Sequence, residues 1–137
     1  MKDPTRKFMD LLDEENIRYQ LHDETTNNGS DILYSRNDGD NMKNMLILFF
    51  IDDYDAEIMT RIAEVPEIKR TLLMKELNKI NNQYKYVNFY ITDSGEINVQ
   101  TSFVFRNCCA AEICLEMARK LVEIADECYP RIMKLVW

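Results

Sequence analysis

Glycine and proline, the residue types that most often interrupt helices and strands, are scarce in this chain. Only three glycines and three prolines occur among its 137 residues, whereas the two types together make up about 12% of an average protein. Because turns and irregular loops depend on these residues, we expect few and short connections. A chain of this length corresponds to about one domain, so we expect residues 1–137 to form a single compact domain.

The same scarcity excludes several kinds of active site. A loop that wraps around a phosphate needs several glycines close together, and Gly29, Gly39 and Gly95 lie far apart. The single histidine, His22, excludes a site built on two imidazoles. We therefore expect no cofactor, and the sequence shows no catalytic motif.

Acidic residues outnumber basic ones, and the whole excess lies near the start of the chain. The net charge is −7; residues 1–55 carry 13 acidic and six basic side chains, and residues 56–137 carry 11 of each. An acidic protein repels nucleic acid and anionic lipid, so neither is an expected partner. The polar first residues and the absence of any run of 18 apolar residues predict a cytoplasmic protein without a membrane span.

The first thirty residues predict a helix, a strand and a loop. Asp3 as N-cap and Pro4 at the first helical position predict a helix over residues 4–15. Alternating apolar and polar residues then predict a short strand over 17–21. The polar segment 23–30 predicts a surface loop.

Asp38-Gly39 predicts a tight hairpin. This dipeptide is a preferred two-residue turn, and it lies between two segments with strand character, residues 32–35 and 45–51.

A two-residue turn fixes the register of that hairpin. It places Ile32 opposite Met45 and Tyr34 opposite Lys43. The strand over 45–51 is apolar on both faces, which predicts a central strand with other structure covering each side.

Residues 55–65 fit two patterns. Ile58, Ile62 and Val65 have helical spacing, while Ile58, Thr60 and Ile62 also alternate as in a strand. The short link from the preceding strand favours a strand, with a helix as the alternative. Pro66 then begins a helix predicted over 66–83, with an inward side formed by Ile68, Leu72, Leu73, Leu77 and Ile80.

The clearest hairpin spans residues 86–105. Asp93-Ser94-Gly95 predicts a three-residue loop with Gly95 in the left-handed conformation. On the buried face this loop pairs Ile91 with Ile97, Phe89 with Val99 and Val87 with Thr101. The opposite face is polar and consists of Tyr86, Asn88, Tyr90, Asn98, Gln100 and Ser102.

A long helix is expected to begin near Asn107 and to run past Glu127. Pro130 should break or kink it, leaving residues 132–137 as an apolar tail that covers the sheet or contacts a partner. The inward stripe of the helix is Ala110, Cys114, Met117, Leu121, Ala125 and Cys128. The complete order, α-β-β-β-β-α-β-β-α, predicts an α+β fold in which helices pack on a mostly antiparallel sheet.

This order and three local motifs resemble the YbjN family, whose members are described as bacterial sensory transduction regulators. The motifs are a helix end that leads into an aromatic strand, a hairpin turn and a helix stop: Leu77-Asn78-Lys79-Ile80-Asn81, Tyr90 to Gly95, and Tyr129-Pro130. The resemblance covers about residues 5–135. It implies a fold similar to class I type III secretion chaperones, and a small, often dimeric bacterial domain that binds proteins and is not an enzyme.

The four cysteines do not have the spacing of a zinc site. We interpret Cys114 and Cys128 as small buried apolar residues. The alternative for the other two is a reactive thiol, because Cys108 and Cys109 lie near a predicted helix N-terminus, which lowers a thiol pKa.

Two further groups of residues could form a metal site or a catalytic site, although in each case ordinary solvent-exposed residues are the favoured interpretation. The acidic turns are more often solvated connections than a cation site; they contain Asp38, Asp40, Asp52, Asp53 and Asp55. His22, beside Asp23 and Glu24, could be a general base, but no nucleophile is predicted near it. We expect no metal and no catalytic residue.

The expected function is therefore binding of a protein partner or self-association as a homodimer. Tyrosine and amide side chains supply flat contact area and hydrogen bonds at interfaces. The candidate partner-binding residues are Tyr86, Asn88, Tyr90, Gln100 and Trp137. Two alternatives remain: an immunity-type inhibitor whose acidic first half neutralises a basic protein, and an enzyme with no motif visible in the sequence.

Overall fold

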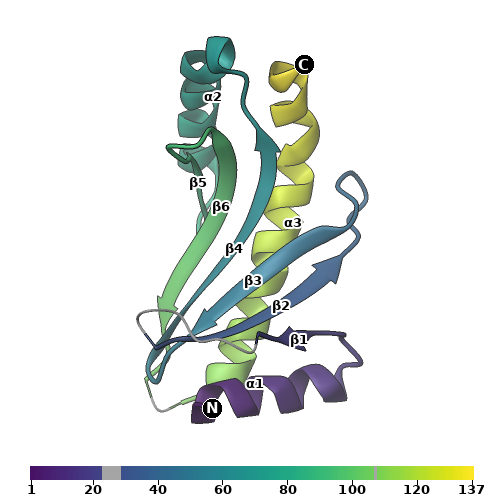
Figure 1. Cartoon of the computed structure of the whole chain (residues 1–137), viewed down its shortest axis with the longest axis vertical. Coiled ribbons are helices and arrows are strands. Elements are labelled where there is room, and N and C mark those ends of the chain that lie inside the picture. Colours follow the sequence, from purple (N-terminus) through teal and green to yellow (C-terminus); the bar gives the residue numbers. More distant parts are fainter. Residues whose placement is uncertain (23–28, 107) are drawn as a thin grey trace.

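The computed structural model describes residues 1–22, 29–106 and 108–137. The order of its helices and strands is the predicted one (Figure 1). The elements are α1 (Asp3–Glu14), β1 (Gln20–Leu21), β2 (Asp31–Asn37), β3 (Met45–Ile51), β4 (Asp55–Glu64), the 3-10 turn η1 (Glu67–Lys69), α2 (Arg70–Gln83), β5 (Asn88–Ile91), β6 (Glu96–Val104) and α3 (Ala110–Val136).

The strands form one antiparallel sheet in the order β1-β2-β3-β4-β6-β5. Helix α3 packs against β4 and β6, α1 packs against α3, and α2 packs against β5 and α3. Figure 1 shows α3 running behind the sheet for most of the length of the molecule. The fold is thus an α+β arrangement with a helical layer on one sheet face, as predicted.

The core lies between this sheet face and the helices. Met45, Ile47, Phe49 and Ile51 on β3 all point into it and are almost fully buried. The rings of Phe49 and Phe8 lie with their centroids 5.1 Å apart, which ties α1 to the sheet. The predicted inward stripe of α3 is largely confirmed, because Cys114, Leu121, Ala125 and Cys128 are buried, although Ala110 and Met117 are only half-buried.

Two predictions about strands are confirmed. Residues 55–65, for which a helix was the alternative, form β4. The β5–β6 hairpin has the predicted register, with Phe89 opposite Val99 and Ile91 opposite Ile97. Gly95 has φ +84°, the left-handed conformation that its three-residue loop requires. The ladder begins at Asn88, so the predicted pair between Val87 and Thr101 lies outside it.

The predicted two-residue turn between β2 and β3 is wrong. Residues 38–44 form a longer loop, and Ile32 lies opposite Phe50 and Tyr34 opposite Leu48. The cause is a set of polar contacts that closes a wider loop: Asp38 Oδ1 accepts a hydrogen bond from the Asn44 backbone N–H (2.7 Å).

Asp126 of α3 holds the tip of this loop. Its carboxylate accepts hydrogen bonds from the backbone N–H groups of Asp40 (3.0 Å), Asn41 (2.9 Å) and Met42 (2.7 Å). We call these three hydrogen bonds, together with the one that the Asn41 side-chain amide donates to the Asp126 carbonyl, the Asp126 clamp. A Cβ atom at Gly39 would lie 2.2 Å from Asp126 Oδ1, so glycine is needed there for this close approach.

Of the predicted break or kink at Pro130, the break is wrong, because α3 continues to Val136. A proline lacks the N–H that would bond to the carbonyl four residues earlier, which here belongs to Asp126. That carbonyl instead accepts a hydrogen bond from the Asn41 side-chain amide (3.1 Å). The segment after Pro130 is anchored by Ile132, which is fully buried, so it is a helix end that packs on the core and not a separate tail.

Three smaller predictions near the helix ends also differ. Asp3 is not the N-cap of α1; the helix follows Lys2, and Asp31 of β2 binds this end by accepting hydrogen bonds from the Lys2 N–H (2.8 Å) and the Thr5 hydroxyl (2.7 Å). Only Gln20–Leu21 of the strand predicted over 17–21 is paired. The predicted loop 23–30 lies mainly outside the described residues, and the last helix begins at Ala110, three residues after the predicted start.

The predicted inward side of the second helix is correct only in its later turns. Leu73, Leu77 and Ile80 are buried, but Ile68 is 93% exposed and Leu72 is 50% exposed. The reason is that residues 67–69 form a 3-10 turn before α2 begins at Arg70. Helical spacing counted from Pro66 therefore assigns the wrong face to these two side chains.

Candidate functional site

The sheet face opposite the helices, which we call the open face, is not covered by any helix in the described parts of the chain (Figure 1). Alternate residues of β2 to β6 point to this face, as their register with the buried residues requires. Its members are Ile32, Tyr34, Arg36, Leu46, Leu48, Phe50, Glu57, Met59, Arg61, Asn88, Tyr90, Asn98, Gln100 and Ser102.

Six neighbouring side chains make one half of the open face apolar. Cross-strand pairing places Phe50 beside Ile32, and Leu48 between Tyr34 and Met59. We call this group the apolar strip; it consists of Ile32, Tyr34, Leu46, Leu48, Phe50 and Met59, all half-buried. Contiguous apolar surface is uncommon on soluble monomers and often marks a binding site.

The predictions from the sequence missed the apolar strip because they explained the apolar residues of β3 by cover on both sides of the strand. The sequence predicts structure on both sides of β3, but the described helices cover only the side of Ile47 and Phe49. The predicted register also placed Tyr34 opposite Lys43, which disperses the strip. The signal that could have revealed the strip is the run of seven apolar residues over 45–51. Such a run makes both faces of the strand apolar, whereas the described helices cover only one of them.

A depression of about 440 Å³ on the open face combines apolar walls with an unused hydrogen-bond acceptor. Leu46, Leu48 and Met59 line it together with Asn98. Asn98 is 6% exposed, and its Oδ1 atom has no hydrogen-bond partner within the described residues. Its amide nitrogen lies 3.5 Å from the Tyr90 hydroxyl. An unpartnered buried acceptor is costly, and this one has almost no surface accessible to solvent.

Three of the five predicted partner-binding residues lie on the open face. Asn88 is opposite Gln100, and Tyr90 is opposite Asn98. Gln100 is in turn opposite Met59 on β4, so these polar residues adjoin the apolar strip. The structure thus brings three of the predicted residues and the missed ones into one surface.

Tyr86 and Trp137 do not share that surface. Tyr86 has φ 75°, and Lys120 Nζ of α3 lies 5.1 Å from the centre of its ring, so the tyrosine lies against the helix side. Trp137 is 85% exposed at the end of α3. The Lys69 ammonium group holds this end by donating a hydrogen bond to the Val136 carbonyl (3.0 Å).

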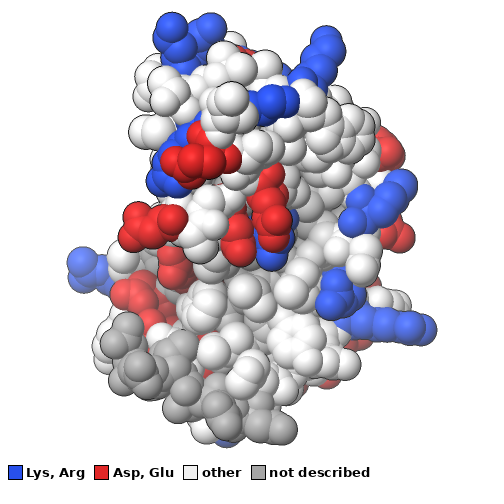
Figure 2. All heavy atoms as spheres, turned by 45° about the horizontal axis from the view of Figure 1, so that its top comes forward, with Lys and Arg blue, Asp and Glu red and all other residues white. Residues whose placement is uncertain are grey.

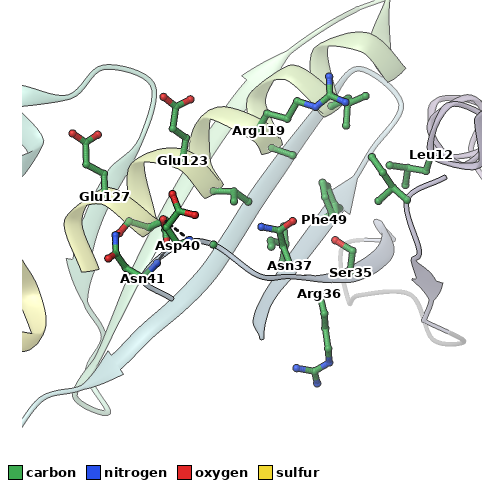
Figure 3. A pocket seen from close by; sticks show the side chains of 17 residues that line it. Leu12, Ser35, Arg36, Asn37, Asp40, Asn41, Phe49, Arg119, Glu123 and Glu127 are labelled. Carbon is green, nitrogen blue, oxygen red and sulfur yellow. Dashed lines mark hydrogen bonds between the residues drawn. The ribbon is translucent and has the colours of Figure 1, made fainter. Parts of the chain in front are cut away.

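A second hollow, of about 690 Å³, lies on the helical side between α3 and the β2–β3 hairpin (Figure 3). Figure 3 shows Asp40 and Asn41 meeting α3 at one end, while Arg36 points away from the hollow. Two of its charged groups are used within the chain: Asp126 in the Asp126 clamp, and Arg119 beside Glu15 at 3.9 Å. The open face offers more unsatisfied surface, so we take it as the candidate site.

The acidic turns are not brought together. Asp38 and Asp40 precede β3, whereas Asp52, Asp53 and Asp55 follow it, so the length of the strand separates the two groups. In the described residues no three His, Cys, Asp or Glu side chains are placed to hold a metal ion. His22 is exposed after β1; the two acidic residues after it lie outside the described ranges.

The cysteines fall into two pairs of different character. Cys114 and Cys128 are buried, and burial raises the pKa of the Cys114 thiol to about 12. Cys108 and Cys109 are exposed. The alternative of a lowered thiol pKa does not hold for Cys109, because a hydrogen bond with the Cys108 sulfur raises its pKa.

On the face drawn in Figure 2, acidic and basic side chains are interspersed with uncharged surface. No helix in the described ranges is both long and apolar enough to span a membrane.

Solved structures confirm the fold. The crystal structure of YbjN, a putative transcription regulator from E. coli, has 15% sequence identity and a TM-score of 0.64, and the match covers 94% of this chain and 91% of that one. The heterodimeric ExoU–SpcU complex of the Pseudomonas aeruginosa type III secretion system gives 11% identity and a TM-score of 0.52 over 75% of this chain and 82% of the other.

The ExsC–ExsE complex is similar at 6% identity and a TM-score of 0.50, over 95% of this chain and 96% of the other. No curated protein matches the sequence. The family model described as "Putative bacterial sensory transduction regulator" matches residues 10–133. The chain therefore belongs to the YbjN family.

Proposed function

We propose that this chain is a non-catalytic protein-binding domain with a chaperone-like or regulatory role, and that its open face holds part of a partner protein. The observation that carries the proposal is the apolar strip. Its six side chains lie side by side on a sheet face that the described helices leave uncovered. Burying such a surface against a partner removes apolar area from water, which is the main driving force of protein association.

The depression beside the strip indicates what the partner supplies. Leu46, Leu48 and Met59 would receive an apolar side chain. The nearly buried amide group of Asn98 lines the same depression and adds a polar wall to it.

Charges at the two ends of the strip would orient the partner. Arg36 lies opposite Leu46 at one end, and Glu57 lies opposite Phe50 at the other. Opposite charges at the ends of an apolar surface favour one direction of a bound segment over the reverse. The proposed partner therefore carries an acidic group at the Arg36 end and a basic group at the Glu57 end.

Two structural neighbours support a protein as the partner. ExoU–SpcU is described as a heterodimeric complex, and ExsC–ExsE is also a complex of two proteins. A second copy of this chain is the other possible occupant of the open face, as in the predicted homodimer.

The test compares two leucine substitutions of the same chemistry. Leu48→Asp places a charge in the apolar strip, while Leu72→Asp places it on exposed α2. Both proteins are used as bait in native bacterial lysate, with circular dichroism to confirm folding and light scattering to measure mass. We expect wild type and Leu72→Asp to retain one stoichiometric protein and Leu48→Asp to lose it.

The experiment distinguishes a partner protein from a second copy of this chain as the occupant of the open face. If the purified wild type is a dimer and Leu48→Asp is a monomer, the open face joins two copies and the second-copy alternative is correct. If all three proteins retain the same partner with equal affinity, the open face is not the binding site and the proposal is wrong. Met59→Gln, a milder change in the strip, repeats the comparison should Leu48→Asp unfold.

A further inference from the structure

Two adjacent exposed thiols, which the proposed function does not use, lie in the connection between β6 and α3. Cys108 and Cys109 are both exposed, and their sulfur atoms are 2.9 Å apart. The other cysteines, Cys114 and Cys128, are buried in α3. The described chain therefore presents its accessible thiols as a single close pair.

The backbone holds the two thiols on the same side. In an extended chain, successive side chains point in opposite directions, which would separate the sulfur atoms. Cys109 instead has φ 57°, the left-handed conformation. Hydrogen bonds fix the backbone on both sides: Cys108 N–H donates to the Phe105 carbonyl (3.2 Å), and the Cys109 carbonyl accepts from Ile113 N–H (3.0 Å).

We propose that Cys108 and Cys109 form a redox-active dithiol site that a low-molecular-weight disulfide, such as glutathione disulfide, converts reversibly to an intramolecular disulfide. The proposal does not depend on the open face. It follows from two thiols already in contact, because a disulfide forms only between sulfur atoms that can approach closely.

The reaction balances as two thiol–disulfide exchanges. A thiolate on Cys108 attacks one sulfur of glutathione disulfide, whose S–S bond breaks and releases one glutathione. Cys109 then attacks the Cys108 sulfur of the mixed disulfide, and the second glutathione leaves. The two protein thiols lose two electrons and two protons, and glutathione disulfide gains both to become two molecules of glutathione.

The order of attack follows from the contact between the thiols. The hydrogen bond with Cys108 raises the pKa of Cys109, and the nearby Glu112 carboxylate acts in the same direction. These contacts favour Cys109 as the thiol that acts second, so we assign the first attack to Cys108.

The test uses the full chain and counts thiols on the folded protein. The reduced protein is incubated with glutathione disulfide, and intact mass and maleimide labelling are measured before and after treatment with dithiothreitol. We expect the mass to fall by two hydrogen atoms, labelling of both exposed cysteines to disappear, and both changes to reverse. Cys114 and Cys128, labelled only after denaturation, are the internal control for folding.

Single substitutions identify the chemistry. Cys109→Ser should stop at a stable mixed disulfide, seen as one added glutathionyl group on Cys108, because no second thiol can resolve it. Cys108→Ser should react more slowly. The proposal is wrong if wild type keeps two labelled thiols, accumulates glutathionyl adducts without losing two hydrogens, or forms only disulfides between chains.

Discussion

The two long hairpins of this protein differ in what determines their register. In β5–β6, the loop contains its own determinant, because Gly95 adopts φ +84° and Thr92 and Glu96 close the turn through a hydrogen bond between Thr92 N–H and the Glu96 carbonyl (2.8 Å). In β2–β3, the loop is held by Asp126, more than 80 residues away in the sequence. Local turn chemistry is readable from a sequence, and a contact from a distant helix is not.

Asp126→Ala should give the largest effect of four changes that test this difference. It removes the acceptor of three backbone N–H groups, and we expect a loss of about 2 kcal/mol in the free energy of unfolding. Urea unfolding measures it. Amide exchange should become faster in residues 40–42 and stay unchanged in the β5–β6 turn; equal acceleration in both loops would contradict the comparison.

Gly39→Ala should cost slightly less, about 1.5 kcal/mol. The new Cβ would lie 2.2 Å from Asp126 Oδ1, so the carboxylate must move and its hydrogen bonds weaken. A double-mutant cycle isolates this cause: in an Asp126→Ala background, Gly39→Ala should cost almost nothing. Additive losses would show that Gly39 acts independently of the clamp.

Gly95→Ala should cost about 1 kcal/mol, because a residue with a side chain is strained at positive φ. The space around it is open, since the new Cβ meets only the Val65 carbonyl oxygen at 3.6 Å. The cost should therefore be the same with and without Asp126, as determined by the same unfolding experiment. A dependence on Asp126 would mean that the two hairpins are coupled.

Acid should weaken the β2–β3 loop and leave the β5–β6 turn intact, the smallest of the four effects. Hydrogen bonds from the N–H groups of Met42, Asn41 and Asp40 lower the pKa of Asp126 below its ordinary value of 3.8. A carboxyl whose pKa is lower in the folded state stabilises it above the unfolded-state pKa and loses this effect as pH falls through the folded value.

The stability difference between wild type and Asp126→Asn should accordingly shrink as pH falls from about 4 towards 2. Thermal unfolding across this range measures it. A difference that is constant with pH would show that Asp126 is not ionised in the clamp.

The contrast also explains which parts of the fold were predictable. The element order, the strand over 55–65 and the β5–β6 register follow from periodicity and turn residues within about ten positions. Pro130 was misjudged because the partner of the Asp126 carbonyl is Asn41, far away in the chain. Local rules cannot identify such a partner.

The candidate site was predicted in part for the same reason. Asn88, Tyr90 and Gln100 follow from the alternation within one hairpin, and they do lie on the open face. Tyr86 does not lie on that face, because its positive φ interrupts the alternation of side chains. The apolar strip depends on the β2–β3 register, which the distant Asp126 helps to fix, and on which face the helices cover, so local patterns alone do not determine it.

Site-specific photo-crosslinking tests the central claim, that the open face binds a protein, most directly. p-Benzoylphenylalanine replaces Phe50 in the apolar strip in one protein and Trp137, which is 85% exposed on the helical side, in another. After irradiation in cells, the chain with Phe50→p-benzoylphenylalanine should give one discrete crosslinked protein, and the Trp137 variant should not give that product. Crosslinking from position 137 alone, with none from position 50, would contradict the claim.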